Sequence, residues 1–104
     1  MAAAFSTGSV GTSAVALTTS DLGVSKYGIV IIPDINNSGQ IYWRTLASVG
    51  ATPDITAGFG ASATDGSQLQ PGYNTVPPTV ALDARMIQVV ANAAGQNYSI
   101  IVVK

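Results

Sequence analysis

Apolar residues recur along most of this chain with the spacing of β-strands. In residues 13–20, SAVALTTS, Val15 and Leu17 alternate with smaller residues, which predicts a half-buried strand with both side chains on one face. Residues 27–33, YGIVIIP, are a continuous β-branched run, typical of a strand buried on both faces. Pro33 ends this run because proline cannot donate to a strand ladder.

Two further runs predict hairpins. After the turn-like Asn36–Gly39, residues 40–46 alternate as a strand that would return alongside residues 27–33. Near the C-terminus, two runs flank a turn at residues 92–96 and predict a terminal hairpin. Across that turn we expect two sets of residues to face each other: Ile87, Val89 and Ala91 on one strand, and Tyr98, Ile100 and Val102 on the other.

The remaining segments are small, polar or rich in turn residues. Residues 1–12 predict a frayed N-terminal arm, with the domain occupying residues 13–104. Residues 47–68 predict a long loop, with a short strand near Ile55 as an option, and such loops usually carry function or pack against a neighbour. Further on, Pro77-Pro78 excludes a central strand at that point.

These elements define one all-β domain. We predict an antiparallel β-sandwich or a jelly-roll-like barrel of about six to eight short strands. The Ala-rich stretches raise a helical alternative, but Gly and Thr interrupt each of them. The chain of 104 residues suffices for a single core.

Charge changes the picture by excluding partners. The chain has four Lys or Arg, five Asp and a net charge of −1, so it lacks the basic surface that binds phosphates. Nucleic acid and membrane are therefore not expected partners, and the N-terminus shows no basic, apolar leader. Without such a leader, we expect the protein to be made in a cytoplasm. A nearly neutral surface gives little repulsion between copies, which favours an assembled protein.

Candidate chemistry is sparse. Without His, Cys or Glu, the chain lacks the usual general base, thiolate nucleophile and zinc ligands, and its five Asp lie in separate turn-like segments. Asp34–Gly39 starts like a calcium loop, but position 12 is Thr45 where a bidentate Glu is needed, so we interpret it as a hairpin turn. Residues 58–63, GFGASA, match a loose dinucleotide pattern without its strand and helix, and predict a flexible loop. We expect no catalytic, metal or cofactor site, although folding could still bring two Asp together.

Aromatic residues are the remaining candidates for binding. Most of them, including Trp43 and Tyr42, sit in strand-like runs, where core packing is the default. Tyr73 follows a Pro-Gly turn and is the first candidate for contact with a partner. Phe5 in the arm and Phe59 in the long loop are the other two expected contacts.

The order of the segments resembles a recurrent small β protein among the virion components of tailed bacteriophages. The likeness runs from Val10 to Val103 through VGTSAVALT, YGIVIIPDINNSGQIYW, LQPGYNTV and LDARMIQVVANAAGQNYSIIVV. Its matching positions fall in two predicted turns and the last hairpin: Asn37, Gly39, Ile41 and Tyr42, then Leu69, Pro71 and Gly72, then Ile87, Val89, Ala91, Ala94, Gly95 and Gln96. The insert at residues 47–68 departs from the pattern.

The resemblance implies a structural protein of the virion, and within that group we expect a capsid decoration or cement protein. Its partner would be the major capsid protein or another virion protein, and we expect a homo-oligomer, with a trimer as the first guess. The arm at residues 1–12 would add a strand to a sheet edge of a neighbour. The alternative is a carbohydrate- or receptor-binding module on a tail or head fibre, which requires an exposed aromatic cluster.

Overall fold

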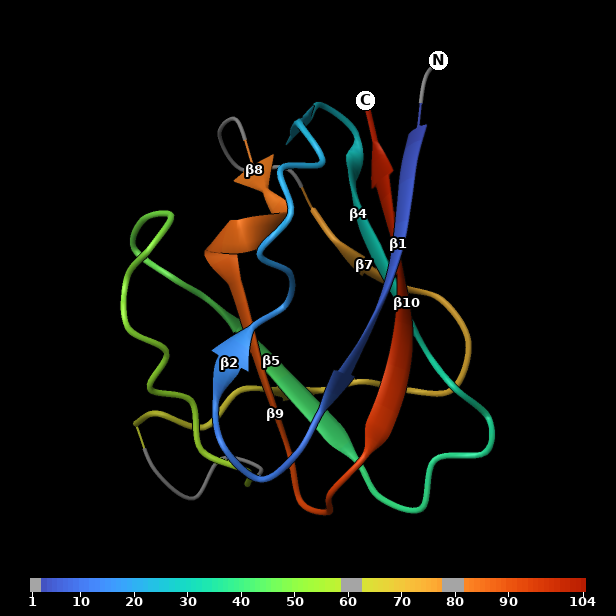
Figure 1. Ribbon diagram of the computed structural model, residues 1–104, viewed down its shortest axis with the longest axis vertical. Helices are drawn as coiled ribbons and strands as arrows, with labels where there is room; N and C mark the ends of the chain where they lie inside the picture. The colour runs from blue at the N-terminus through green and yellow to red at the C-terminus, as the bar shows by residue number, and fades with distance from the viewer. Residues whose placement is uncertain (1–2, 59–62, 78–81) are drawn as a thin grey trace.

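Two four-stranded antiparallel sheets lie face to face, as the computed structural model shows for residues 3–58, 63–77 and 82–104 (Figure 1). The prediction of an all-β, sandwich-like domain is confirmed. The described residues form ten strands rather than six to eight, because four of the strands are only two residues long. Such short pieces carry no periodic signal that a sequence pattern could reveal.

The strands divide into two main sheets and a small one. Sheet A has the order β1 (Ala3–Val10), β10 (Gln96–Val103), β4 (Gly28–Pro33) and β7 (Asn74–Val76). Sheet B has the order β2 (Val15–Ala16), β9 (Ile87–Ala91), β5 (Ile41–Thr45) and β6 (Ser67–Gln68). The small sheet pairs β3 (Val24–Ser25) with β8 (Leu82–Asp83), and a single 3₁₀ turn, η1, follows at Ala84–Met86.

The core fills the space between sheets A and B. Each strand sends alternate side chains inward, so sheet A contributes Ile29 and Ile31 from β4 and Ile100 from β10, all nearly inaccessible to solvent. Sheet B contributes Ile41 and Val89 to the same cluster. The β-branched run at residues 27–33 forms β4 inside sheet A, but the prediction that it is buried on both faces is wrong, because Val30 and Ile32 remain partly exposed on its outer face.

Residues 3–10 differ from the frayed arm that we predicted. They form β1, which pairs antiparallel with β10 along its whole length, from Ala3 opposite Val103 to Val10 opposite Gln96. The small residues of β1 hid this strand, because Ser, Gly and Ala have low β propensity and gain their place through the ladder. Gly8 is required there, since a Cβ atom would stand 2.5 Å from the Tyr98 ring.

Both predicted hairpins are wrong. Strands β4 and β5 belong to different sheets, and so do β9 and β10, so the turns at residues 34–40 and 92–95 are arches that cross from one sheet to the other. The strands joined by each arch stack across the core instead of pairing edge to edge. Our expectation that Ile87, Val89 and Ala91 face Tyr98, Ile100 and Val102 therefore holds across the core, where all six belong to one cluster.

The two arches lie together at one end of the sandwich, at the bottom of Figure 1, and hydrogen bonds join them. Gln96, 2% exposed, accepts from the Gly39 N–H at 2.8 Å and donates to the Ser38 Oγ at 3.1 Å and to the Ala94 carbonyl at 2.7 Å. The amide of Asn37 both donates to and accepts from the backbone of Asn97, at 2.9 and 2.8 Å.

The strand predicted at residues 13–20 is shorter than expected. Only Val15 and Ala16 pair with β9, and the chain bends at Leu17. Val15 is consequently 40% exposed while Leu17 is buried at 2%, so the two do not share a face. The Leu17 N–H still donates to the Ile87 carbonyl at 2.7 Å, and the Leu17 carbonyl accepts from the Tyr98 hydroxyl across the core.

We predict that replacing Gln96 with Leu lowers the free energy of unfolding by about 2–3 kcal/mol, because the change leaves buried polar partners in both arches without their hydrogen bonds. Urea denaturation of wild type and variant measures this difference. Gln70→Ala is the matched control, since Gln70 is exposed, and should change stability by less than about 0.5 kcal/mol. Equal stabilities of Q96L and Q70A would contradict the role given to Gln96.

Tyr98 predicts an alkaline pH dependence of stability. Burial raises the pKa of its hydroxyl to about 12, above the ordinary value of 10.0 that it regains on unfolding. Between these two values the unfolded chain has lost the proton and the folded one keeps it, so stability is full below pH 10 and falls as pH rises toward 12, by up to about 2–3 kcal/mol. Denaturation series from pH 8 to 11.5 test this fall, and Tyr98→Phe should show a shallower one; identical slopes would refute it.

Candidate functional site

The outer face of sheet A is a regular surface that the described chain leaves uncovered. We use this name for the outward residues of its four strands: Ala3, Phe5, Thr7 and Ser9 on β1; Asn97, Ser99, Ile101 and Val103 on β10; Val30 and Ile32 on β4; Thr75 on β7. The register places Phe5, Ile101 and Val30 in one row across three strands. None of the outward residues is charged, so the face offers apolar contact and hydroxyl groups.

The opposite face of the molecule is partly covered by its own chain. Part of the long loop at residues 47–68 folds back over sheet B, where Ile55, 3% exposed, packs against Tyr42 and Val90. Gln88 holds it there: its side-chain carbonyl accepts from the N–H groups of Asp54 at 2.7 Å and Ile55 at 2.9 Å. The loop therefore serves as a cover for sheet B, and this contrast singles out sheet A as the exposed sheet.

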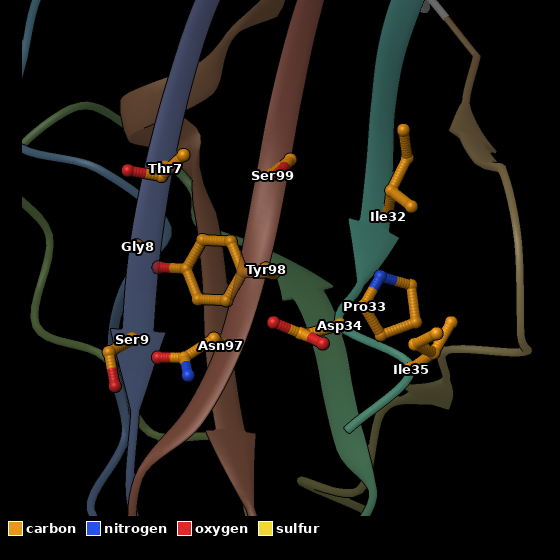
Figure 2. Close-up of a pocket in the computed structure, with 10 residues that line it drawn as sticks. All are labelled: Thr7, Gly8, Ser9, Ile32, Pro33, Asp34, Ile35, Asn97, Tyr98 and Ser99. Atoms are coloured by element: carbon orange, nitrogen blue, oxygen red, sulfur yellow. The ribbon is translucent and has the colours of Figure 1, made fainter. Parts of the chain in front are cut away.

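A shallow depression of about 640 Å³ lies at the arch end of the outer face (Figure 2). Thr7 and Ser9 of β1 and Ser99 of β10 supply hydroxyl groups on one side, and Ile32 of β4 supplies an apolar wall on the other. Figure 2 also shows the Tyr98 ring extending from β10 toward Gly8. The depression is open, and its lining carries one carboxylate, that of Asp34, so it suits contact with another protein surface better than enclosure of a small ligand.

Two of the three expected partner contacts are strongly exposed. Phe5 is 71% exposed and lies on the outer face of sheet A, while Tyr73 is 78% exposed and directly precedes β7. Phe59 lies outside the described residues. Sequence reasoning placed Phe5 in an arm and could not assign it to a sheet face. Ile35, 93% exposed in the arch at residues 34–40, was missed as a candidate contact.

The exposed aromatic side chains come from separate segments. Phe5 lies on β1, Tyr27 directly precedes β4, and Tyr73 directly precedes β7. Strands β10 and β4 separate Phe5 from the β7 edge in the order of sheet A.

Asp34 makes local contacts of the kind expected of a turn. Its Oδ1 accepts from the Asn36 N–H at 2.9 Å, and its carbonyl accepts from the Asn37 N–H at 3.1 Å. The segment that opens like a calcium loop is thus an Asx turn, although it begins an arch and not a hairpin. The glycine-rich pattern at residues 58–63 lies mostly outside the described residues.

Asp21 and Asp83 do converge, on Arg85. Arg85 Nη2 lies 2.8 Å from Asp83 Oδ2 and 3.6 Å from Asp21 Oδ1. Hydrogen bonding from Arg85 lowers the pKa of Asp83, so its carboxyl stays ionised at neutral pH and is unsuited to act as a general acid. Asp83 also accepts from the Arg85 N–H at 2.9 Å and thereby caps η1.

The described residues contain neither a candidate metal-binding group nor a helix that could span a membrane. Residues 3–58, 63–77 and 82–104 contain no group of three or more acidic, His or Cys side chains that could hold a metal ion. In the same part of the chain, no helix has the length and apolar character needed to cross a bilayer.

Comparison with known proteins gave no match: no family model, no curated protein and no solved structure is significantly similar to this chain.

We predict that Gln88→Leu releases the loop from sheet B, because the N–H groups of Asp54 and Ile55 lose their acceptor. Amide hydrogen exchange at Ile55 should rise by at least tenfold, and protease cleavage within residues 47–58 should accelerate. Gln40→Leu is the control. In the described chain the Gln40 side chain accepts a hydrogen bond only from the Gln68 side-chain amide, so this substitution should leave amide exchange at Ile55 unchanged. Unaltered exchange at Ile55 in Q88L would show that the loop is held by other contacts.

Proposed function

We propose that this protein is a noncatalytic structural component of a bacteriophage virion that decorates the assembled head, docking through the outer face of sheet A. The observation that carries the proposal is the contrast between the two sheets: sheet B is partly covered by the chain's own loop, and the outer face of sheet A is open, with apolar and neutral polar side chains. The virion assignment itself comes from the resemblance of the segment order.

The size of the face fits a repeated, modest contact. With roughly 3.3 Å of rise per residue and roughly 4.8 Å between strands, the four strands present roughly 400 Å² of sheet. A specific protein interface usually buries about 800 Å² per partner, so a single copy of this face would bind weakly. On a shell, many weak contacts to the major capsid protein add up, and binding only the assembled head stabilises it by mass action.

The site chemistry supports binding over catalysis. Asp83 is held ionised by Arg85, Asp34 is used in its own turn, and Asp54 accepts from the side-chain amide of Gln88 at 3.0 Å. A glycan-binding fibre module, the alternative, requires clustered aromatic side chains. The exposed Phe5, Tyr27 and Tyr73 come from three different segments, which favours the docking of a flat protein surface.

The test is cosedimentation of the purified protein with undecorated phage heads, with tail tubes as the control particle. The proposal predicts saturable binding to heads at a fixed copy ratio. Binding to tail tubes alone, or to neither particle, would refute it.

Replacing Ile101 with Lys should weaken head binding at least tenfold, because docking would bury an unpaired charge in the middle of the face. Ile101 is already partly exposed, so the fold should persist, and circular dichroism checks this. Val49→Lys is the matched control on the loop over sheet B, where Val49 is 45% exposed, and should bind like wild type. Equal binding by I101K and V49K would exclude the outer face of sheet A as the docking surface.

A further inference from the structure

The outer edge of β1 differs from every other described sheet edge in this molecule. Among the strands that end sheets A and B, β7 has three residues and β2 and β6 have two each, whereas β1 has eight. Natural sheets protect a long edge with Lys, Pro, a bulge or a covering segment. The sequence of β1, AAFSTGSV, has no charged residue and no Pro, and its register with β10 is regular throughout.

The backbone groups on that edge can be assigned from the ladder. The carbonyl of Asn97 accepts from Asp34 and that of Val103 from Tyr27, so the odd-numbered residues of β10 bond toward β4. Because hydrogen bonding alternates along an antiparallel strand, the even-numbered residues of β10 bond toward β1. Their partners are Ala4, Ser6, Gly8 and Val10. The N–H and C=O groups of Ala3, Phe5, Thr7 and Ser9 therefore point away from the sheet.

We infer that this edge pairs with the β1 edge of a second copy, antiparallel about a two-fold axis at Ser6. In that register Phe5 lies opposite the partner copy's Thr7, and Ala3 lies opposite the partner copy's Ser9. All four outward residues of each strand then exchange both of their hydrogen bonds. In this register the numbers of each pair of opposite residues add up to 12. If they added up to an odd number, residues of one strand that face outward would lie opposite residues that face inward on the other. With any other even number, some of the outward residues Ala3, Phe5, Thr7 and Ser9 would have no partner among these four.

A second copy is the occupant that the chemistry favours. A two-fold interface brings each residue near its own counterpart, so a charged edge would meet like charge. The β1 edge carries none, and no other described sheet edge offers a strand of comparable length. Pairing also joins two outer faces into one surface of roughly 800 Å², the size of one side of a standard interface. The basic unit would then be a dimer, and this pairing does not depend on whether the protein binds phage heads.

The first test uses cysteine cross-linking, which is clean because the chain has no Cys. Ser6 would face its own counterpart as a non-hydrogen-bonded pair, with Cα atoms about 4.5 Å apart, within the range of a disulfide. Under mild oxidation, Ser6→Cys should form covalent dimers at least tenfold faster than Thr7→Cys, although Thr7 is the more exposed residue. Faster cross-linking of T7C, or equal rates, would overturn the register and with it the inference.

Strand exchange is the competing arrangement, in which β1 of one copy pairs with β10 of another. Ser6 lies opposite Ile100 in the β1–β10 ladder. Mixing Ser6→Cys with Ile100→Cys would then give the mixed disulfide in preference to the Ser6→Cys homodimer. That outcome would overturn pairing of the two β1 edges.

The second test measures mass by sedimentation velocity over a range of protein concentrations. Wild type should show a concentration-dependent monomer–dimer equilibrium, and Thr7→Pro should remain monomeric. The Thr7 N–H points outward, so proline removes a hydrogen bond between copies and leaves the β1–β10 ladder intact. Thr75→Pro is the control on the β7 edge and should still dimerise. Two results would refute the inference. One is a wild type that stays monomeric up to about 1 mM, the concentration at which an interface worth roughly 4 kcal/mol would be half formed. The other is a T7P variant that dimerises like wild type.

Discussion

The joining of the two sheets at one end of the sandwich is the constraint on which the rest of this structure depends. Both arches cross there, and an arch exposes backbone groups that a hairpin ladder would satisfy. Gln96, buried between the arches, supplies acceptor and donor together, and the Asn37 amide reproduces a strand-like pair with Asn97. Because these bonds fix how β4 stacks on β5 and β9 on β10, they set the alignment of the whole core.

Hydrogen bonding from a side-chain amide to loop backbone also distinguishes the two outer faces. On sheet B, the Gln88 amide binds the backbone of Asp54 and Ile55, which lets Ile55 seal Tyr42 and Val90 from water. Burying an Ile side chain contributes about 1.5–3 kcal/mol, enough to hold a short segment in place. Sheet A has no such cover within the described residues, and its partly exposed Val30, Ile32 and Ile101 form a surface that another protein could bury.

Strand β1 lies at the edge of sheet A, next to the exposed outer face of that sheet. Its inward residues are small and make room for the Tyr98 ring, so β1 is attached mainly by its ladder to β10. Its outward backbone groups repeat the pattern that β10 presents to it. A sheet that ends in this way can pair with a further strand, and the small net charge of the chain, −1, gives little repulsion between copies. The first residues do add a strand to a sheet edge, but to a sheet of their own chain and not, as we expected, to that of a neighbour.

Sequence by itself determined the all-β class, the strand at residues 27–33, and the inward sets on β9 and β10, because period-two alternation and β-branching indicate burial. It also located the turns at residues 34–40 and 92–95, since each is a run of Asn, Gly and other small or polar residues between two apolar runs. Only the tertiary structure decided that these turns cross between sheets. An arch and a hairpin are flanked by the same alternation of apolar and polar residues, and they differ only in whether the second strand joins the same sheet or the opposite one. The place of Phe5 on an open face, and of Ile55 against Tyr42 and Val90 of sheet B, likewise depended on contacts between residues far apart in the chain, which no local pattern encodes.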